Sequence, residues 1–261
     1  MTKQSLGQNF LMHPATGERI VQAAELSKKE HVLEIGPGTG MLTRALLKEG
    51  HSVTAVEADG ELVENLVETF AEEIKSKRLK LVHEDIRTFN LSSLPKKYSL
   101  VANIPYYITG EIIRTFLTAK WKPRSMTLLV QKEVAVRITG RGERNHKESL
   151  LSLSVKAYGD PKYCFTVPKG AFRPVPKVDS AVISIQDIRK DSFKNVKEEE
   201  SFFELLKMGF AHKRKVLSGN LADKYGQKKV GEAFVAASVP HKARSEDLSL
   251  ADWKRLFVNL S

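Results

Sequence analysis

A regular alternation of strand-like and helix-like segments, beginning at residue 31, constrains the fold of this chain more than any other feature. Short apolar runs predict strands over 31–35, 52–56, 79–83, 98–102 and 126–130. Apolar residues at helical spacing predict helices over 41–49, 61–74, about 110–119 and from the last of these strands to about 138. Because strands separated by helices pair in parallel, this order predicts an α/β fold with a Rossmann-like sheet covered on both faces.

The end of this region is less regular. Residues 140–149 are polar and contain glycine, which predicts an exposed and mobile loop. Residues 150–158 are compatible with either a helix or a strand, whereas 180–185 predict a strand that closes the sheet.

The chain changes character at about residue 186. Residues 190–200 are charged and poor in apolar side chains, which predicts a linker. Beyond them every apolar pattern has helical spacing, and Ser249 with Asp252 predicts a capping box for the last helix. We therefore predict an α/β domain over 1–188 and a small all-helical domain over 189–261.

Positive charge is concentrated after the first hundred residues. The net charge is +11, and residues 101–185 contain 14 basic but only 6 acidic side chains. Clustered Lys and Arg favour a polyanion partner, because they gain affinity by releasing counterions from phosphates. A merely lysine-rich surface is the alternative, and composition does not distinguish RNA from DNA or an anionic membrane.

Composition also indicates the compartment of the protein and argues against membrane and metal association. The one cysteine, Cys164, excludes an internal disulfide and favours a reducing compartment. No apolar run approaches the roughly 20 residues that span a bilayer, and the first residues do not resemble a signal peptide. The seven histidines are scattered and form no metal-binding motif. We expect a cytoplasmic monomer without metal or membrane association.

A glycine-rich loop follows the first predicted strand. Residues 34–40 read EIGPGTG, in which Gly36 and Gly38 let a ligand approach the backbone closely. The spacing differs from the dinucleotide fingerprint G-x-G-x-x-G, so a pyrophosphate ligand is not indicated. Such a loop by itself is often only a turn.

Two carboxylates follow the next strands. Glu57 is placed to accept hydrogen bonds from ribose hydroxyls, and Asp85 from the exocyclic amine of an adenine. Taken alone, each of these residues is more simply interpreted as a solvated carboxylate at the end of a strand. Parallel strands, however, bring their carboxyl ends to one edge of the sheet, so the two carboxylates are expected to lie close together. Together with Glu34, and with no Lys or Arg expected beside them, they favour a ligand with a cation, a ribose and an adenine. S-adenosylmethionine is such a ligand.

The segment after the fourth strand, Asn103-Ile104-Pro105-Tyr106, predicts chemistry at an adenine amine. The N6 amine is a weak nucleophile because its lone pair is delocalised into the ring. The Asn103 oxygen and a backbone carbonyl at Ile104 or Pro105 can accept its two hydrogens and free the lone pair. Tyr106 offers a ring on which an extruded base can stack. A simple turn is the alternative.

These residues resemble the ribosomal RNA adenine dimethyltransferases, a family that includes the small-subunit (KsgA) enzymes and the macrolide-resistance enzymes. The matching segments are 7–11 (GQNFL), 34–40 (EIGPGTG), Glu57, Asp85, 103–106 (NIPY), 131–138 (QKEVAVRI) and 172–180 (FRPVPKVDS). The resemblance implies a class I S-adenosylmethionine-dependent methyltransferase fold.

The resemblance also implies roles for individual residues. The cofactor would contact Asn9, Leu11, Gly36, Gly38, Glu57, Asp85, Ile86 and Asn103, with Asn9 and Leu11 closing over it as a lid. The target base would contact Asn103, Pro105, Tyr106 and Phe172, with Tyr106 and Phe172 on its two faces. RNA would contact Arg141, Arg144, Lys147, Arg173, Lys213, Arg214 and Lys215. Tyr107 departs from the family, where Asn or His is common.

Two segments favour the small-subunit group, namely 172–180 and the stretch 209–221 (GFAHKRKVLSGNL), which is similar to a basic helix of that group. The expected activity is N6,N6-dimethylation of two adjacent adenosines in a hairpin near the 3′ end of small-subunit ribosomal RNA, within the immature subunit. The alternatives are a resistance enzyme acting on large-subunit RNA and a ribosome-assembly factor that acts mainly by binding. A DNA adenine methyltransferase is disfavoured, because Ile104 replaces the first proline of that group's motif.

Overall fold

The structure is a computed structural model that describes residues 9–142, 147–189, 192–212 and 214–261. The described residues form two compact units. The first combines residues up to 135 with 160–188, and the second combines 136–159 with 189–261. We call them the sheet unit and the helical unit. Residues 136–159, which we assigned to the first domain, thus pack within the helical unit.

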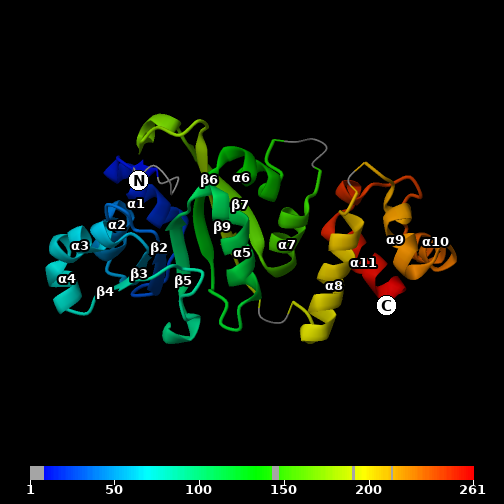
Figure 1. Cartoon of the computed structure of the whole chain (residues 1–261), viewed down its shortest axis with the longest axis horizontal. Helices are drawn as coiled ribbons and strands as arrows, with labels where there is room; N and C mark the ends of the chain where they lie inside the picture. The colour runs from blue at the N-terminus through cyan, green and yellow to red at the C-terminus, as the bar shows by residue number, and fades with distance from the viewer. Residues whose placement is uncertain (1–8, 143–146, 190–191, 213) are drawn as a thin grey trace. The chain divides into compact units, whose positions relative to one another are not determined.

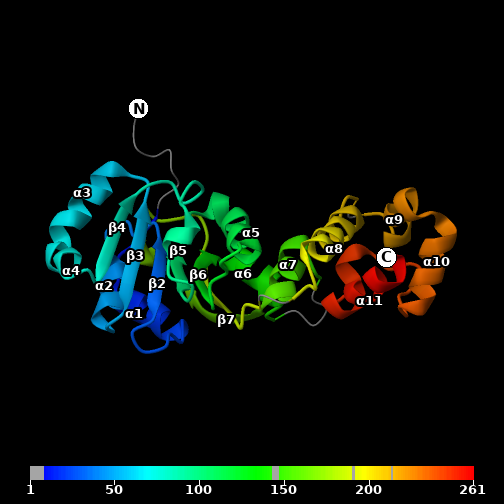
Figure 2. The same ribbon diagram turned by 90° about the horizontal axis from the view of Figure 1, so that it is seen from below.

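The sheet unit contains a seven-stranded sheet (Figures 1 and 2). In spatial order the strands are β4 (Leu79–His83), β3 (Ser52–Glu57), β2 (His31–Ile35), β5 (Ser99–Asn103), β6 (Met126–Gln131), β9 (Ser180–Gln186) and β7 (Asp160–Val167). The first five are parallel to one another, and β9 pairs antiparallel with both β6 and β7. The predicted α/β sheet and its closing strand are therefore confirmed.

Strand β7 has no counterpart in the prediction. It lies at the edge of the sheet, and most of its side chains are partly exposed. An edge strand with a polar outer face lacks the continuous apolar run that marks the central strands. Residues 150–158, which are compatible with a helix or a strand, form the helix α7 (Leu150–Tyr158).

Helices cover the sheet on both faces, as side-chain alternation requires. The helices α1 (Pro14–Ala23) and α2 (Met41–Lys48) share one core cluster with Val32, Val101 and Leu129 of the central strands. Neighbouring strand residues, such as Leu33 and Leu100, are fully buried toward the other face. There the helix α5 (Thr109–Thr118), seen in front of the strands in Figure 1, buries its apolar side.

The helix predicted over 61–74 is broken in two. The structure has α3 (Gly60–Thr69) and α4 (Ala71–Lys75), separated by Phe70 with φ −118° and ψ 30°. Phe70 is 2% exposed and belongs to the core cluster behind the glycine loop. Burial of this ring therefore outweighs continuity of the helix.

Shorter elements connect these. The 3₁₀ turns are η2 (Leu91–Ser93), η3 (Tyr106–Ile108) and η4 (Lys169–Ala171), and α6 (Lys132–Thr139) follows β6. A two-stranded antiparallel sheet joins β1 (Phe10–Leu11) to β8 (Phe172–Arg173), which brings the N-terminal segment beside the loop that precedes β9.

The helical unit is built from α7, α8 (Val196–Gly209), α9 (Leu217–Tyr225), α10 (Gln227–Ala236), the turn η5 (Ser245–Asp247) and α11 (Leu250–Leu260). Its fully buried side chains include Phe202, Phe234 and Trp253. The helix α7 belongs to this unit because Tyr158 at its end packs against α8. The Tyr158 ring stacks on Phe203 of α8 with centroids 5.7 Å apart, and the Tyr158 hydroxyl donates to Glu199.

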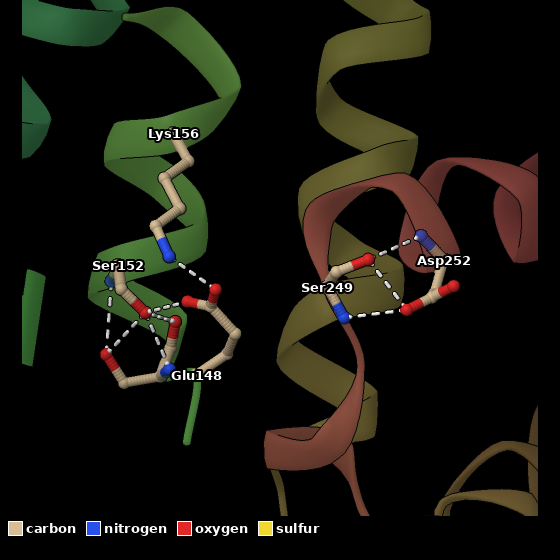
Figure 3. A network of polar contacts seen from close by, with 6 residues as sticks. Glu148, Ser152, Lys156, Ser249 and Asp252 are labelled. Atoms are coloured by element: carbon tan, nitrogen blue, oxygen red, sulfur yellow. Dashed lines mark hydrogen bonds and ion pairs between the residues drawn. The ribbon is translucent and has the colours of Figure 1, made fainter. Parts of the chain in front are cut away.

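Two helices of this unit begin with reciprocal caps (Figure 3). The predicted box at α11 is confirmed, since Ser249 Oγ accepts from the Asp252 amide at 3.2 Å and Asp252 accepts from the Ser249 amide at 2.9 Å. A second box links Ser149 and Ser152 at α7, where Glu148 accepts from Ser152 at 2.7 Å and pairs with Lys156.

Two predictions in this unit are wrong in part. The linker expected over 190–200 contains the start of α8, because Asn195 caps the helix by accepting from the Glu198 amide at 2.9 Å. His212, Arg214 and Lys215 were expected on a helix but lie between α8 and α9. The helix α8 ends at Gly209, where an added Cβ would lie 2.3 Å from the Trp253 ring, and Val216 is extended.

Candidate cofactor and substrate site

A cavity opens at the carboxyl ends of the parallel strands, where open α/β sheets bind their ligands. We call it the strand-end cavity. The residues predicted from sequence that line it are Asn9, Leu11, Gly36, Gly38, Glu57, Asp85, Ile86, Asn103, Pro105 and Tyr106. They come from β1 and the residue before it, from the last residues of β3 and β5, and from the segments that follow β2, β4 and β5.

The glycine loop needs glycine for two separate reasons. Gly36, Gly38 and Gly40 have φ values of 62°, 59° and 78°, the left-handed region that other residues avoid. A Cβ on Gly38 would also lie 2.9 Å from the Phe10 ring, and one on Gly40 would lie 2.5 Å from the Phe70 ring. The loop is therefore held between β1 and the core.

Glu57 is fixed at the end of β3. It is 3% exposed, and its carboxylate accepts backbone hydrogen bonds from Gly38 at 3.1 Å, Ala58 at 2.9 Å and Asp59 at 3.1 Å. These bonds hold both oxygens at the cavity wall. Since each carboxylate oxygen has two lone pairs, Oε2, which accepts the Gly38 bond, keeps acceptor capacity for a ribose hydroxyl.

Glu34 lies deeper at the same wall. It is 1% exposed, and Thr43 Oγ1 donates to it at 2.6 Å. The pKa of Glu34 is raised to about 8, mainly by burial and also by the nearby charge of Glu57, against the lowering effect of the Thr43 bonds. A cation placed in the cavity would favour the ionised form of this group.

The surroundings of Asp85 differ from the expectation. Arg87 lies beside it and donates from Nε to Oδ1 at 3.0 Å, from Nη2 to Oδ2 at 2.5 Å and from its amide at 2.9 Å. These bonds lower the pKa of Asp85. The inference that no Lys or Arg lies near the three carboxylates is therefore wrong, because the turn after β4 folds Arg87 back onto Asp85.

Asn103 is oriented by the N-terminal segment. Its Nδ2 donates to the backbone oxygen of Asn9 at 3.0 Å, which joins the end of β5 to the residue before β1. This bond uses the donor side of the amide and leaves Oδ1 as an acceptor for another amine. The contact between Asn9 and Asn103 couples the expected lid to the expected reaction site.

Tyr106 and Tyr107 follow at the end of the same loop. The Tyr106 hydroxyl lies 2.7 Å from Ser180 Oγ of β9, its ring is half-buried, and burial raises its pKa. Tyr107 also lines the cavity but is 64% exposed. The two neighbouring rings therefore occupy different environments.

Phe172 does not lie where it could stack on one face of the target base, as expected from the resemblance. It is 1% exposed, lies in the core cluster and is not among the residues that line the cavity. The reason is the pairing of β1 with β8, which sets Phe172 opposite Leu11 and directs both into the core. In this conformation no face of the ring is open to a base.

The structure describes five of the seven residues expected to contact RNA, because Arg144 and Lys213 lie outside the described ranges. Arg173 is exposed and pairs in register with Phe10 at the cavity edge. Arg214 and Lys215 are exposed in the segment between α8 and α9, and Arg141 is exposed after α6. Lys147 forms ion pairs with Asp247 and Glu246, which offset its charge.

Sequence reasoning missed other residues of the cavity wall, among them Phe10 and Arg87, and it noted Tyr107 only as a departure from the family. Each is adjacent or nearly adjacent to a predicted residue, and that proximity was the only signal available. Over the described ranges, no group of three or more His, Cys, Asp or Glu side chains is arranged to hold a metal ion. No helix in the same ranges is long and apolar enough to cross a membrane.

Known proteins resemble this chain over its whole length. The family described as ribosomal RNA adenine dimethylase matches residues 1–261. A ribosomal RNA small subunit methyltransferase A from Dehalococcoides mccartyi is 39% identical over 263 residues, covering 97% of this chain and 87% of that protein. A protein of the same name from Mycoplasmopsis pulmonis is 36% identical over 260 residues, covering 99% of this chain and 98% of that protein. The crystal structure of the 23S rRNA methyltransferase ErmE superposes on this chain with a TM-score of 0.78 at 29% identity, covering 97% of this chain and 99% of the ErmE chain.

Proposed function

Since this chain belongs to the ribosomal RNA adenine dimethylase family, we propose that it transfers methyl groups to N6 of adenosines in small-subunit ribosomal RNA. The observation that carries the proposal is the meeting of Glu57, Asp85 and Asn103 at one cavity beside the glycine loop. The substrate we propose is a pair of adjacent adenosines in a hairpin near the 3′ end of that RNA, within the immature subunit. That substrate implies the cytoplasm as its location.

Relatives named for the small subunit favour that substrate over large-subunit RNA. They are 36–39% identical to this chain, against 29% for the 23S rRNA methyltransferase ErmE. The segment 172–180 favours the same group.

The cavity fits S-adenosylmethionine. Glu57 would hold the ribose, Asp85 and Ile86 the adenine, and the backbone at Gly36 and Gly38 the methionine part. The fit rests on the left-handed backbone at Gly36 and Gly38, with open space beside Gly36, and on the buried carboxylate of Glu34, which a sulfonium or ammonium cation would complement. Asn9 and Leu11 would close the cavity. Bound there, S-adenosylmethionine would supply an electrophilic methyl group.

The residues of the loop after β5 would position the acceptor. Asn103 Oδ1 would accept one hydrogen of the N6 amine, and the carbonyl of Ile104 or Pro105 the other, so that the nitrogen lone pair is freed. Pro105 restricts the backbone of this turn, and Tyr106 provides a ring held by Ser180. Catalysis by this arrangement is mainly positioning, and it requires no strong general base.

RNA affinity would come from exposed basic side chains in each unit, with Arg173 beside the cavity and Arg214 with Lys215 in the helical unit. Contacts of this kind go mainly to phosphates and set position rather than sequence preference. The ion pairs of Lys147 make it the weakest of the described candidates.

The test is transfer of labelled methyl groups from S-adenosylmethionine to unmethylated small subunits, naked large-subunit RNA and duplex DNA at one stated salt concentration. We expect dimethyladenosine only in small subunits. Asn103→Ala should lower transfer by at least 100-fold while S-adenosylmethionine still binds, because Glu57 and Asp85 remain. Label in large-subunit RNA alone would overturn the substrate assignment, and an unaffected Asn103→Ala variant would overturn the assigned site.

A second measurement addresses a role in subunit assembly. If cells that lack the protein recover normal assembly with the Asn103→Ala variant, occupation of the immature subunit is the larger part of the function.

A further inference from the structure

We propose that Tyr107 is a stacking platform for the nucleotide adjacent to the target adenosine, outside the pocket that holds the target itself. This inference rests on the proposed function and deepens it, because it assigns a recognition contact for the second base of the substrate. It concerns the position at which this chain departs from the resembling family.

The first support is the unusual exposure of Tyr107. It is 64% exposed although it lines the strand-end cavity, whereas Tyr106 beside it is half-buried. A large ring open to water at the edge of a cavity offers apolar area that a partner can cover. Aromatic rings in this setting bind unstacked RNA bases by stacking, and they do so with little dependence on base identity.

The second support is backbone geometry. Tyr106 and Tyr107 are consecutive in the 3₁₀ turn η3, in which successive side chains diverge by about 120°. The Tyr106 ring is anchored through its hydroxyl to Ser180, and Asn103 is anchored to Asn9. These anchors define the place of the target base. Tyr107 points away from Tyr106, so its ring is available to the next base along the strand rather than to the same base.

The third support is local charge, which favours a base over a phosphate. Arg87 lines the same cavity as Tyr107, and its guanidinium donates to Asp85. Because Asp85 already binds the guanidinium through two of its nitrogens, little net positive charge remains beside the Tyr107 ring. A neutral and flat group fits such a surface better than an anion does.

The test uses steady-state methylation of unmethylated small subunits. Tyr107→Ala should raise KM for the subunit by about 5- to 150-fold, the range of one aromatic–base stack, while the affinity for S-adenosylmethionine stays unchanged. Tyr107→Phe should behave as wild type, because the proposed contact needs the ring and not the hydroxyl. Val67→Ala serves as a control, since this exposed residue of α3 is not among those that line the cavity.

A second substrate identifies the contact. Small subunits are reconstituted around RNA that has one target adenosine and an abasic nucleotide in place of its neighbour. The effect of Tyr107→Ala should disappear on this substrate. Equal KM values for Tyr107→Ala and wild type on intact subunits, or an effect that persists with the abasic neighbour, would overturn the proposal. Failure of wild type to methylate small subunits at all would overturn the proposed function instead, so the two failures are distinguishable.

Discussion

Glu34→Gln should remove a strong pH dependence from the stability of the sheet unit. Glu34 is 1% exposed, and burial raises its pKa from the ordinary 4.5 to about 8. Between these two values the folded protein keeps a proton on Glu34 that the unfolded chain releases. The free energy of unfolding therefore falls as pH rises, by about 1.4 kcal/mol per pH unit from this group.

Glutamine imitates the protonated acid and can still accept from Thr43, but it does not titrate. We therefore expect the free energy of unfolding of Glu34→Gln, relative to wild type, to rise by about 3 kcal/mol between pH 5.5 and pH 7.5. Below pH 4.5 the two proteins should differ least, because Glu34 is then protonated in both folded and unfolded wild type. Other titrating groups cancel in the difference.

The assay is urea unfolding at pH 5.5, 6.5 and 7.5, followed by hydrogen exchange of peptides from β2 and β3, so that the sheet unit is observed separately. Glu64→Gln is the matched control. That carboxylate is exposed on α3, so its substitution removes a surface carboxylate of the same unit that does not line the cavity. A difference between Glu34→Gln and wild type that stays constant within about 0.5 kcal/mol over this range would refute a buried, protonated Glu34.

Three further predictions follow from the same structure. A cation of the bound cofactor should ionise Glu34, so the wild-type affinity for S-adenosylmethionine should rise up to tenfold per pH unit from pH 6 to pH 8. The affinity of Glu34→Gln should not change over this range. Calorimetry in two buffers would detect the proton that wild type releases on binding. Gly40→Ala should destabilise the sheet unit by about 2–5 kcal/mol in urea unfolding, because φ is 78° and the new Cβ meets the Phe70 ring at 2.5 Å. Ser249→Ala should cost about 1 kcal/mol in hydrogen exchange of α11 without altering cofactor affinity, and an unchanged α11 would contradict the cap.

The sheet and the cavity wall were largely predictable from the sequence, because both depend on local patterns. Strands β2 to β6 are apolar runs whose period and length mark them without any knowledge of their partners. The glycine loop follows such a strand directly, Glu57 and Asn103 are the last residues of β3 and β5, and Asp85 lies two residues after β4. Parallel pairing then brings them to one edge of the sheet whatever the details of packing.

The break at Phe70 and the end of α8 at Gly209 were not predictable from the sequence, and at Phe70 burial of the ring overrides local propensity. The helix expected beyond Gly209 followed from the resemblance alone, and α8 ends at that residue. The apolar pattern of 61–74 is helical, but Phe70 is buried behind the glycine loop. The assignment of residues 136–159 to the helical unit has the same origin, in the contacts of Tyr158 with α8.

The sequence by itself thus determined the class of fold, the order of the strands β2 to β6, and the placement of Glu57, Asp85 and Asn103 at the cavity, because these follow from periodicity and from motifs at strand ends. Only the tertiary structure decided that β1 pairs with β8, that Phe172 is buried rather than open to a base, and that Arg87 occupies Asp85. These features arise from contacts between distant segments or from the path of one turn. Such contacts depend on which surfaces meet in three dimensions, and no periodicity along the chain encodes them.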